Sequence, residues 1–322
     1  MNAVAEKTVT VQSRAIEKLK RDLGDVIQGA LDNPKTVDVM CNPDGKIWQE
    51  CVGEKMRCIG SISEGRADSI IKTVAAFHGK EIKKATPLLE ATLPTHNGAR
   101  FTAQLSPAVE RSTFNIRAKA SQVFPLSSYV EKGIMTVEQR GVLQQAVKEH
   151  RNILVVGSTG TGKTTLVNAI IDEMVKQEPS ERIVIIEDTG EIQCRAENSV
   201  QYHATLGVDM TQLIRTTLRM RPDRILVGEV RGAEALDLLD AWNTGHEGGI
   251  ATLHANDALS GLTRLKSLVS RNPFAPKDIE PLIGEAVHCV VHIVRSAGGR
   301  KVAEIIAVNG YSNGHYQIQT IG

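Results

Sequence analysis

The spacing of hydrophobic residues differs between the first third of the chain and the remainder. In the first third, two stretches with apolar residues at helical spacing are combined with short apolar runs separated by turn residues, such as Asn42-Pro43-Asp44-Gly45. This mixture predicts an α+β domain over residues 1–121. The helices are expected at residues 16–31, with Val26 on the apolar face, and 67–77, and the strands at 37–41, 47–50, 56–59, 88–93, 100–105 and 113–119.

Beyond residues 122–135, which we interpret as a linker, apolar strands alternate with helical stretches. Thr136 followed by Gln139 is typical of a capping box at the start of a helix. The alternation over residues 136–322 predicts a mainly parallel sheet with helices on both faces and ligands at the carboxyl ends of its strands. The strands are expected at 153–156, 183–186, 225–227 and 250–253, with further strands, antiparallel ones among the options, at 290–294, 301–308 and 316–318.

The clearest candidate site is the segment Gly-Ser-Thr-Gly-Thr-Gly-Lys-Thr at residues 157–164, directly after an apolar strand and before a helical stretch. Its glycines let backbone N–H groups turn toward phosphate oxygens, so we expect a nucleoside triphosphate site rather than a glycine-rich turn with a chance lysine. Lys163 is expected to reach the phosphates from an exposed loop, and the Thr164 hydroxyl to hold Mg²⁺. The residues expected to bind ATP are Gly157, Ser158, Thr159, Gly160, Thr161, Gly162, Lys163, Thr164 and Thr165.

Three further polar clusters follow expected strands. Glu187 and Glu191 belong to an acidic segment after residues 183–186, which could hold Mg²⁺ or its waters but is by itself more typical of a solvated turn. Glu229 follows an apolar strand, as the acid of a Walker B element does; the alternative is a surface carboxylate. His254 closes another strand and could hydrogen-bond a γ-phosphate, although a lone histidine is more often structural.

In their order along the chain, these segments resemble the Walker A, Asp, Walker B and His boxes of the secretion ATPase superfamily. The resemblance covers the chain from about residue 37 to the C-terminus and is strongest over residues 151–257. Size and N-terminal layout are most similar to the traffic ATPases of type IV secretion and plasmid conjugation, in particular the TrbB-like conjugal-transfer branch. The segments are residues 157–164, Glu187-Asp188-Thr189-Gly190-Glu191, Leu226-Val227-Gly228-Glu229-Val230-Arg231, Gly245-His246 and Thr252-Leu253-His254.

The resemblance implies a RecA-like P-loop ATPase core in a homohexameric ring, with ATP bound between the two domains of a subunit. It further implies that Arg100 and Arg117 of the N-terminal domain reach the phosphates; solvated strand arginines are the alternative. Glu229 is the first choice for orienting or deprotonating the attacking water. Glu187 and Glu191 are expected to share Mg²⁺ and water contacts, with Glu187 and Glu229 acting on the metal through water.

Composition limits the partners of this protein. Its 322 residues carry 38 Lys and Arg against 37 Asp and Glu, and only 3% are aromatic, which weighs against direct sequence-specific nucleic-acid binding. The sequence has no apolar run near 18 residues and no signal-peptide pattern. We therefore expect a cytoplasmic protein without stable membrane insertion, which reaches the inner membrane through partner proteins of a type IV secretion or conjugation apparatus.

The leading interpretation is an ATP-hydrolysing motor for assembly of, or transfer through, a conjugative channel. A pilus-type or type II secretion motor is the nearest alternative. Extension motors of that kind commonly carry Cys-x-x-Cys pairs, which this sequence lacks, whereas a retraction motor is harder to separate. The sequence is also compatible with a nucleotide-dependent DNA translocase and with a ring in which ATP only switches assembly.

Overall fold

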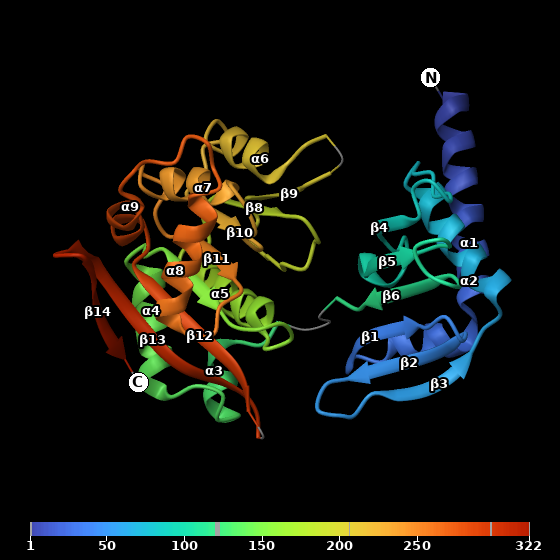
Figure 1. The fold of residues 1–322 in the computed structure, drawn as a ribbon, viewed down its shortest axis with the longest axis horizontal. Coiled ribbons are helices and arrows are strands. Elements are labelled where there is room, and N and C mark those ends of the chain that lie inside the picture. Colours follow the sequence, from blue (N-terminus) through green and yellow to red (C-terminus); the bar gives the residue numbers. More distant parts are fainter. Residues whose placement is uncertain (1, 120–122, 206, 297, 322) are drawn as a thin grey trace. The chain divides into compact units, whose positions relative to one another are not determined.

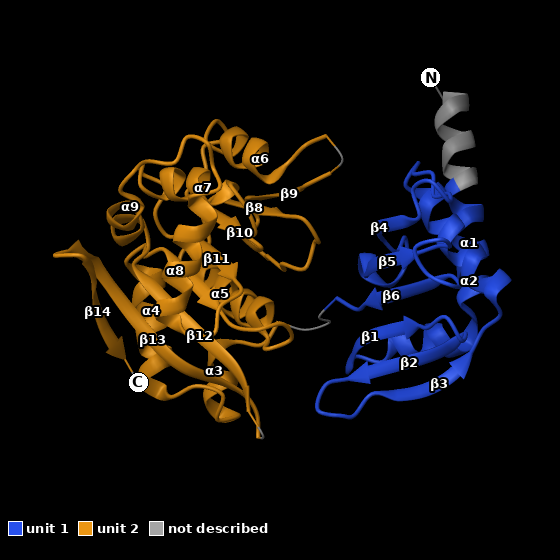
Figure 2. Ribbon diagram, in the orientation of Figure 1, with its two compact units in different colours: residues 1–121 blue, residues 122–322 orange. Residues whose placement is uncertain are grey.

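The computed structural model describes residues 2–119, 123–205, 207–296 and 298–321, with side chains from residue 12 onward. The chain divides into two compact units, Met1–Ser121 and Gln122–Gly322 (Figure 2). In the described part of the chain, no helix combines the length and apolar character needed to cross a membrane.

Unit 1 is an antiparallel six-stranded sheet with two helices packed on it (Figure 1). The strand order is β3-β2-β1-β6-β5-β4. Alternate strand residues face a core that they share with the apolar sides of both helices, and this confirms the expected α+β arrangement. The elements are α1 (Asn2–Asp32), β1 (Thr36–Cys41), β2 (Lys46–Cys51), β3 (Arg57–Ser61), α2 (Glu64–Phe77), β4 (Leu88–Thr92), β5 (Arg100–Gln104) and β6 (Thr113–Arg117), with a short 3₁₀ turn at His96–Gly98.

Helix α1 is interrupted at Gly24, which has a left-handed φ of 61°. Leu23 and Ile27 on either side of the break are buried, whereas Val26 is 50% exposed. The expectation that Val26 belongs to the apolar face is therefore wrong. A continuous helix would have kept one stripe, but the break rotates the residues that follow it relative to the core.

Unit 2 is built on an eight-stranded sheet in the order β14-β13-β12-β7-β11-β10-β8-β9. The six strands from β12 to β9 run parallel, and β13 and β14 continue the sheet antiparallel. The predicted mainly parallel sheet is thus confirmed; of the expected tail strands, β12 runs parallel to β7, whereas β13 and β14 are antiparallel. The strands are β7 (Ile153–Val156), β8 (Ile183–Glu187), β9 (Ser199–His203), β10 (Arg224–Val227), β11 (Ile250–Leu253), β12 (Cys289–Ser296), β13 (Gly299–Ser312) and β14 (His315–Ile321).

Helices cover both faces of this sheet, which explains why β7, β8, β10 and β11 are buried at every position. One core lies under α3, α4 and α5, and a second lies under α6, α7, α8 and α9 (Figure 1). Thr136 and Gln139 form the expected capping box at the start of α4. The helices are α3 (Leu126–Glu131), α4 (Val137–Lys148), α5 (Lys163–Gln177), α6 (Met210–Thr217), α7 (Glu234–Trp242), α8 (Ala258–Val269) and α9 (Ile279–Ala286).

Two parts of unit 2 differ from the sequence-based expectation. The segment 122–135, whose first residue lies outside the described residues, carries α3, and Leu126 and Tyr129 are buried in the core beneath it. Most of this segment therefore belongs to unit 2 and is not a linker between the two units. Strand β9 was not expected, because as an edge strand it is half exposed and its sequence Ser-Val-Gln-Tyr-His has a weak apolar pattern.

Candidate functional site

The glycine-rich loop joins β7 to α5 at the carboxyl end of the unit 2 sheet (Figure 1). Gly162 precedes α5 with a left-handed φ of 97°, which a residue with a side chain rarely adopts. The buried Thr161 hydroxyl donates to the carbonyl oxygen of Ser158 at 2.9 Å and so ties the loop to itself. The loop leads directly into a helix N-terminus, whose free N–H groups and dipole favour an anion such as phosphate.

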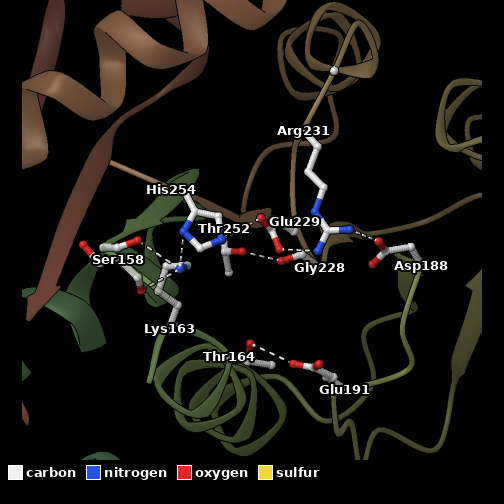
Figure 3. Close-up of polar contacts among 12 residues, drawn as sticks. Ser158, Lys163, Thr164, Asp188, Glu191, Gly228, Glu229, Arg231, Thr252 and His254 are labelled. Carbon is white, nitrogen blue, oxygen red and sulfur yellow. Dashed lines mark hydrogen bonds and ion pairs between the residues drawn. The ribbon is translucent and has the colours of Figure 1, made fainter. Parts of the chain in front are cut away.

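Lys163 is the first residue of α5 and is 8% exposed, so the expectation that it sits on an exposed loop is wrong. Its ammonium folds back under the loop and donates to the carbonyl oxygens of Gly157 at 2.9 Å and Ser158 at 3.1 Å (Figure 3). Burial lowers the pKa of Lys163, although the charges of Glu229 and Glu191 act in the opposite direction. The loop carbonyl oxygens thus hold the ammonium in place, next to the position where the loop would bind phosphate.

Thr164, the next residue, faces the acidic segment that follows β8. Its hydroxyl lies 3.4 Å from the carboxylate of Glu191 (Figure 3). A hydroxyl and a carboxylate are both hard oxygen ligands of the kind that Mg²⁺ takes in proteins. These two side chains therefore fit a magnesium site beside the loop.

Glu187, at the end of β8, is only 1% exposed and is not part of a solvated turn. Its carboxylate accepts hydrogen bonds from the backbone N–H of Glu191 at 2.6 Å and of Ile192 at 3.0 Å, and from the side chain of Gln201. Burial raises the pKa of Glu187, against the effect of these hydrogen bonds. One carboxylate oxygen therefore holds the segment that carries Glu191, and the other is bonded to Gln201 of β9.

Glu229 follows β10 and lies between two basic side chains (Figure 3). Its Oε1 is 3.0 Å from Nε2 of His254, and its Oε2 accepts a hydrogen bond from Nη2 of Arg231 at 2.7 Å. Burial tends to raise the pKa of Glu229, but the hydrogen bond and charge of Arg231, with the charges of His254 and Lys163, outweigh it and place this pKa below its usual value. Glu229 is thus a carboxylate at neutral pH.

His254 follows β11 and connects Glu229 to the loop lysine. Its Nδ1 lies 3.2 Å from the ammonium of Lys163 (Figure 3). Burial and the charge of Lys163 lower the pKa of His254, against the attraction of Glu229. The ring is therefore mainly neutral near pH 7, and an Nδ1 that accepts from the ammonium leaves the ring hydrogen on Nε2, facing the carboxylate.

The ends of β8 and β10 come close because residue 228 is glycine. A Cβ there would lie 2.8 Å from the Cβ of Glu187. The hydroxyl of Thr252 on β11 also donates to the carbonyl oxygen of Gly228 at 2.6 Å (Figure 3). The strand ends thus form one site that contains the predicted residues Lys163, Thr164, Glu191, Glu229 and His254 (Figure 3). Glu187 joins it through its bond to the backbone of Glu191.

Arg100 and Arg117 belong to unit 1 and face each other across β5 and β6, so their side chains leave the same face of that sheet. The guanidinium of Arg117 bonds Asp38 of β1, with N–O distances of 3.3 Å, and Asn115 donates to the same carboxylate at 2.9 Å. Arg117 remains 40% exposed. Its guanidinium is therefore both anchored within unit 1 and accessible.

Sequence reasoning did not assign a role to Arg231, to its second partner Asp188, or to Gln201. Arg231 stood within the Walker B-like segment, two residues after Glu229, and that spacing was a usable signal. Gln201 lies on β9, and its contact with Glu187 depends on the parallel pairing of β8 with β9. Only the sheet reveals that contact.

The chain belongs to the family described as type II/IV secretion system proteins, whose model matches residues 47–318. A conjugal transfer protein TrbB from Rhizobium radiobacter is 44% identical to it over 306 residues, which cover 95% of this chain and 94% of that protein. The family is one of nucleotide-binding traffic ATPases of type IV secretion and conjugation.

Solved structures agree with this assignment. The chain is similar to the VirB11 ATPase of the Brucella suis type IV secretion system, crystallised with sulphate, at 26% identity and a TM-score of 0.50, with 92% of this chain and 96% of that chain covered. The pilus retraction motor PilT with bound ADP shares the fold, with a TM-score of 0.64 at 19% identity over 85% of this chain and 79% of that one.

Proposed function

We propose that this protein hydrolyses ATP and uses the energy to drive assembly of, or transfer through, a conjugative type IV secretion system. The observation that carries the proposal is the site at the strand ends of unit 2, where the loop lysine Lys163, the hydroxyl of Thr164, the carboxylate of Glu229 and the ring of His254 meet. The 44% identity to a conjugal transfer protein supports the biological setting.

In this proposal the loop residues 157–165 bind the phosphates of ATP, and Lys163 neutralises charge on the β- and γ-phosphates. Thr164 and Glu191 would hold Mg²⁺, which supplies positive charge next to the phosphate oxygens. Their facing oxygen atoms fit that ion. Glu187 then acts indirectly on the metal site, because its carboxylate positions the segment that carries Glu191.

Glu229 is proposed to orient or deprotonate the water that attacks the γ-phosphate. It is ionised, stands at a strand end beside the phosphate loop, and is 18% exposed, so a water molecule can reach it. His254 links this carboxylate to Lys163, and we propose that it responds to the γ-phosphate through that link.

Arg100 and Arg117 are proposed to reach the phosphates when unit 1 closes over unit 2. Two guanidinium groups on one sheet face suit the charge of a triphosphate. For Arg117 this contact requires the phosphate to share or replace Asp38, because the guanidinium is bonded to that carboxylate. In this proposal the protein forms a homohexameric ring, as the family implies, and each subunit of the ring undergoes this closure.

We further propose that the protein works at the cytoplasmic face of the inner membrane and is recruited there by components of the secretion apparatus. It is not expected to bind lipid by itself. Flotation of the purified protein with protein-free liposomes at high salt would contradict this proposal.

The decisive experiment is multiple-turnover phosphate release from ATP by the purified full-length chain, combined with complementation of a donor strain that lacks the gene. The proposal requires both turnover and restored plasmid transfer. Turnover with restored pilus retraction but no transfer would contradict the conjugative role, and single-turnover behaviour would contradict a motor.

A further inference from the structure

Arg231 is the basic residue that contacts Glu229 most directly, and the proposed ATPase site leaves it without a function. Its guanidinium bridges two acids from different strand ends: Nη2 lies 2.7 Å from Glu229, and Nη1 donates to the Asp188 carboxylate (Figure 3). The guanidinium therefore joins the segment after β8 to the segment after β10.

The backbone of Arg231 is fixed while its side chain is accessible. The carboxylate of Glu234 accepts from the backbone N–H of Arg231 at 2.7 Å and of Gly232 at 2.8 Å, and Arg271 donates to the carbonyl oxygen of Arg231 at 3.2 Å. The side chain itself is 49% exposed. A change at this position is therefore confined to the side chain, whose tip can exchange partners without displacing the turn.

The charges around Arg231 make such an exchange favourable when a triphosphate arrives. Arg231 contacts Glu229, which contacts His254, and that ring contacts Lys163, so the guanidinium stands close to the phosphates that Lys163 would bind. A γ-phosphate is a stronger acceptor for a guanidinium than a carboxylate that already has a second partner, and Glu229 has His254. Movement of Arg231 toward the γ-phosphate would free one oxygen of Glu229 for water.

We propose that Arg231 is a positioning residue that exchanges partners: it holds the Glu229 carboxylate until the γ-phosphate of bound ATP takes over its guanidinium. The inference rests on the proposed ATPase function and adds a γ-phosphate contact from the same subunit. ADP lacks this phosphate and leaves Arg231 on Glu229 and Asp188. Arg231 thereby ties the release of Glu229 to the presence of the triphosphate.

The test compares the affinities of Mg²⁺–AMP-PNP and Mg²⁺–ADP in the full-length protein. Arg231→Gln should weaken AMP-PNP binding about tenfold or more, the scale for a lost hydrogen bond to a charged group, and leave ADP binding unchanged. Arg231→Lys should retain part of the preference for AMP-PNP over ADP, because it keeps the positive charge. Asp188→Asn should act in the opposite direction and tighten AMP-PNP binding, because it removes a competitor for the guanidinium.

Arg151→Gln is the matched control, because Arg151 also lies two residues after its carboxylate partner, Glu149, and is 51% exposed. It should change neither affinity. An unchanged ratio of the two affinities in Arg231→Gln would overturn the inference, whether or not its melting temperature falls.

The steady-state rates separate the role of Arg231 from the proposed ATPase function. In Arg231→Gln, KM should rise and kcat should fall, because the γ-phosphate loses a contact that binds and positions it. If the wild-type protein releases no phosphate, the proposed function fails, while the affinity ratio still tests Arg231. If the wild type hydrolyses ATP but Arg231→Gln leaves the ratio of the AMP-PNP and ADP affinities unchanged, only the inference about Arg231 fails.

Discussion

The ammonium of Lys163 lies 3.2 Å from Nδ1 of His254, so the residue that would neutralise the phosphates is in direct contact with a residue of a different strand end. The other nitrogen of that ring lies 3.0 Å from Glu229. Through one neutral histidine, the phosphate-binding lysine and the carboxylate proposed to act on water therefore share a single polar network. A substitution at any one of these three residues should therefore alter the hydrogen bonds and the charge balance of the other two.

Replacement of the loop lysine tests the phosphate site. Lys163→Ala should reduce the rate of ATP hydrolysis on the order of 10²–10³-fold, because a charge contact to the transferring phosphate is removed. The fold should persist, although the carbonyl oxygens of Gly157 and Ser158 lose their donor. Phosphate release and circular dichroism measure the two effects. Lys176→Ala in the same helix is the control, and wild-type turnover by the Lys163 variant would refute the site.

The two glutamates at the strand ends should respond differently to the same substitution. Glu229→Gln should bind ATP and assemble but hydrolyse at least about 10²-fold more slowly, because the positioned carboxylate charge is lost. Glu187→Gln should mainly lower stability, by about 1 kcal/mol, because an amide replaces one acceptor oxygen of a buried, fully engaged carboxylate. Urea unfolding and turnover assays distinguish them; slow hydrolysis confined to the Glu187 variant would exchange the roles.

The lowered pKa of His254 predicts a pH dependence of stability. Because the folded chain binds this proton less readily than the unfolded chain, the stabilisation is complete above the unfolded pKa of about 6.5 and is lost as the pH falls toward the folded pKa. Between about pH 7.5 and about pH 5.5, the melting temperature should therefore fall more steeply in the wild type than in His254→Asn. His96 and His288 shift in the same direction and remain in both proteins. Equal slopes would show that His254 does not contribute.

The proposed contribution of unit 1 to ATP hydrolysis is tested by replacing Arg117. Arg117→Ala in the full-length chain should lower kcat on the order of 10-fold or more, the effect of a lost guanidinium contact to the transferring phosphate. Arg111→Ala, an exposed arginine of the same unit, should leave turnover unchanged. Asp38→Asn removes the anchor of Arg117 but keeps its charge, and should retain more activity than Arg117→Ala.

A chain that begins at residue 123 complements that experiment. It should keep the phosphate loop but hydrolyse ATP poorly, because it lacks Arg100 and Arg117. The start must precede α3, since Leu126 and Tyr129 are part of the unit 2 core. Full activity of this shortened chain would show that no unit 1 arginine is needed, whereas the phosphate-loop assignment would survive.

The sequence by itself determined the class of fold and the position of the phosphate loop. Both depend on local patterns: four mostly apolar strand segments, a glycine-rich turn and a following helix are encoded by neighbouring residues. The strand ends that carry Glu229 and His254 were predictable for the same reason. The half-polar edge strand β9 was missed because its burial is set by its neighbour in the sheet.

Tertiary structure decided what the polar side chains do. Glu187 and Glu229 both follow apolar strands, yet one is enclosed by the N–H groups of its own loop and the other lies between Arg231 and His254. The burial of Lys163 depends likewise on how its side chain folds under the loop. Some of these contacts, such as that of Glu229 with His254, join residues that are distant along the chain, and the energies of all of them depend on burial and on charges from other strands. No local pattern encodes them, so only the folded sheet could assign the roles.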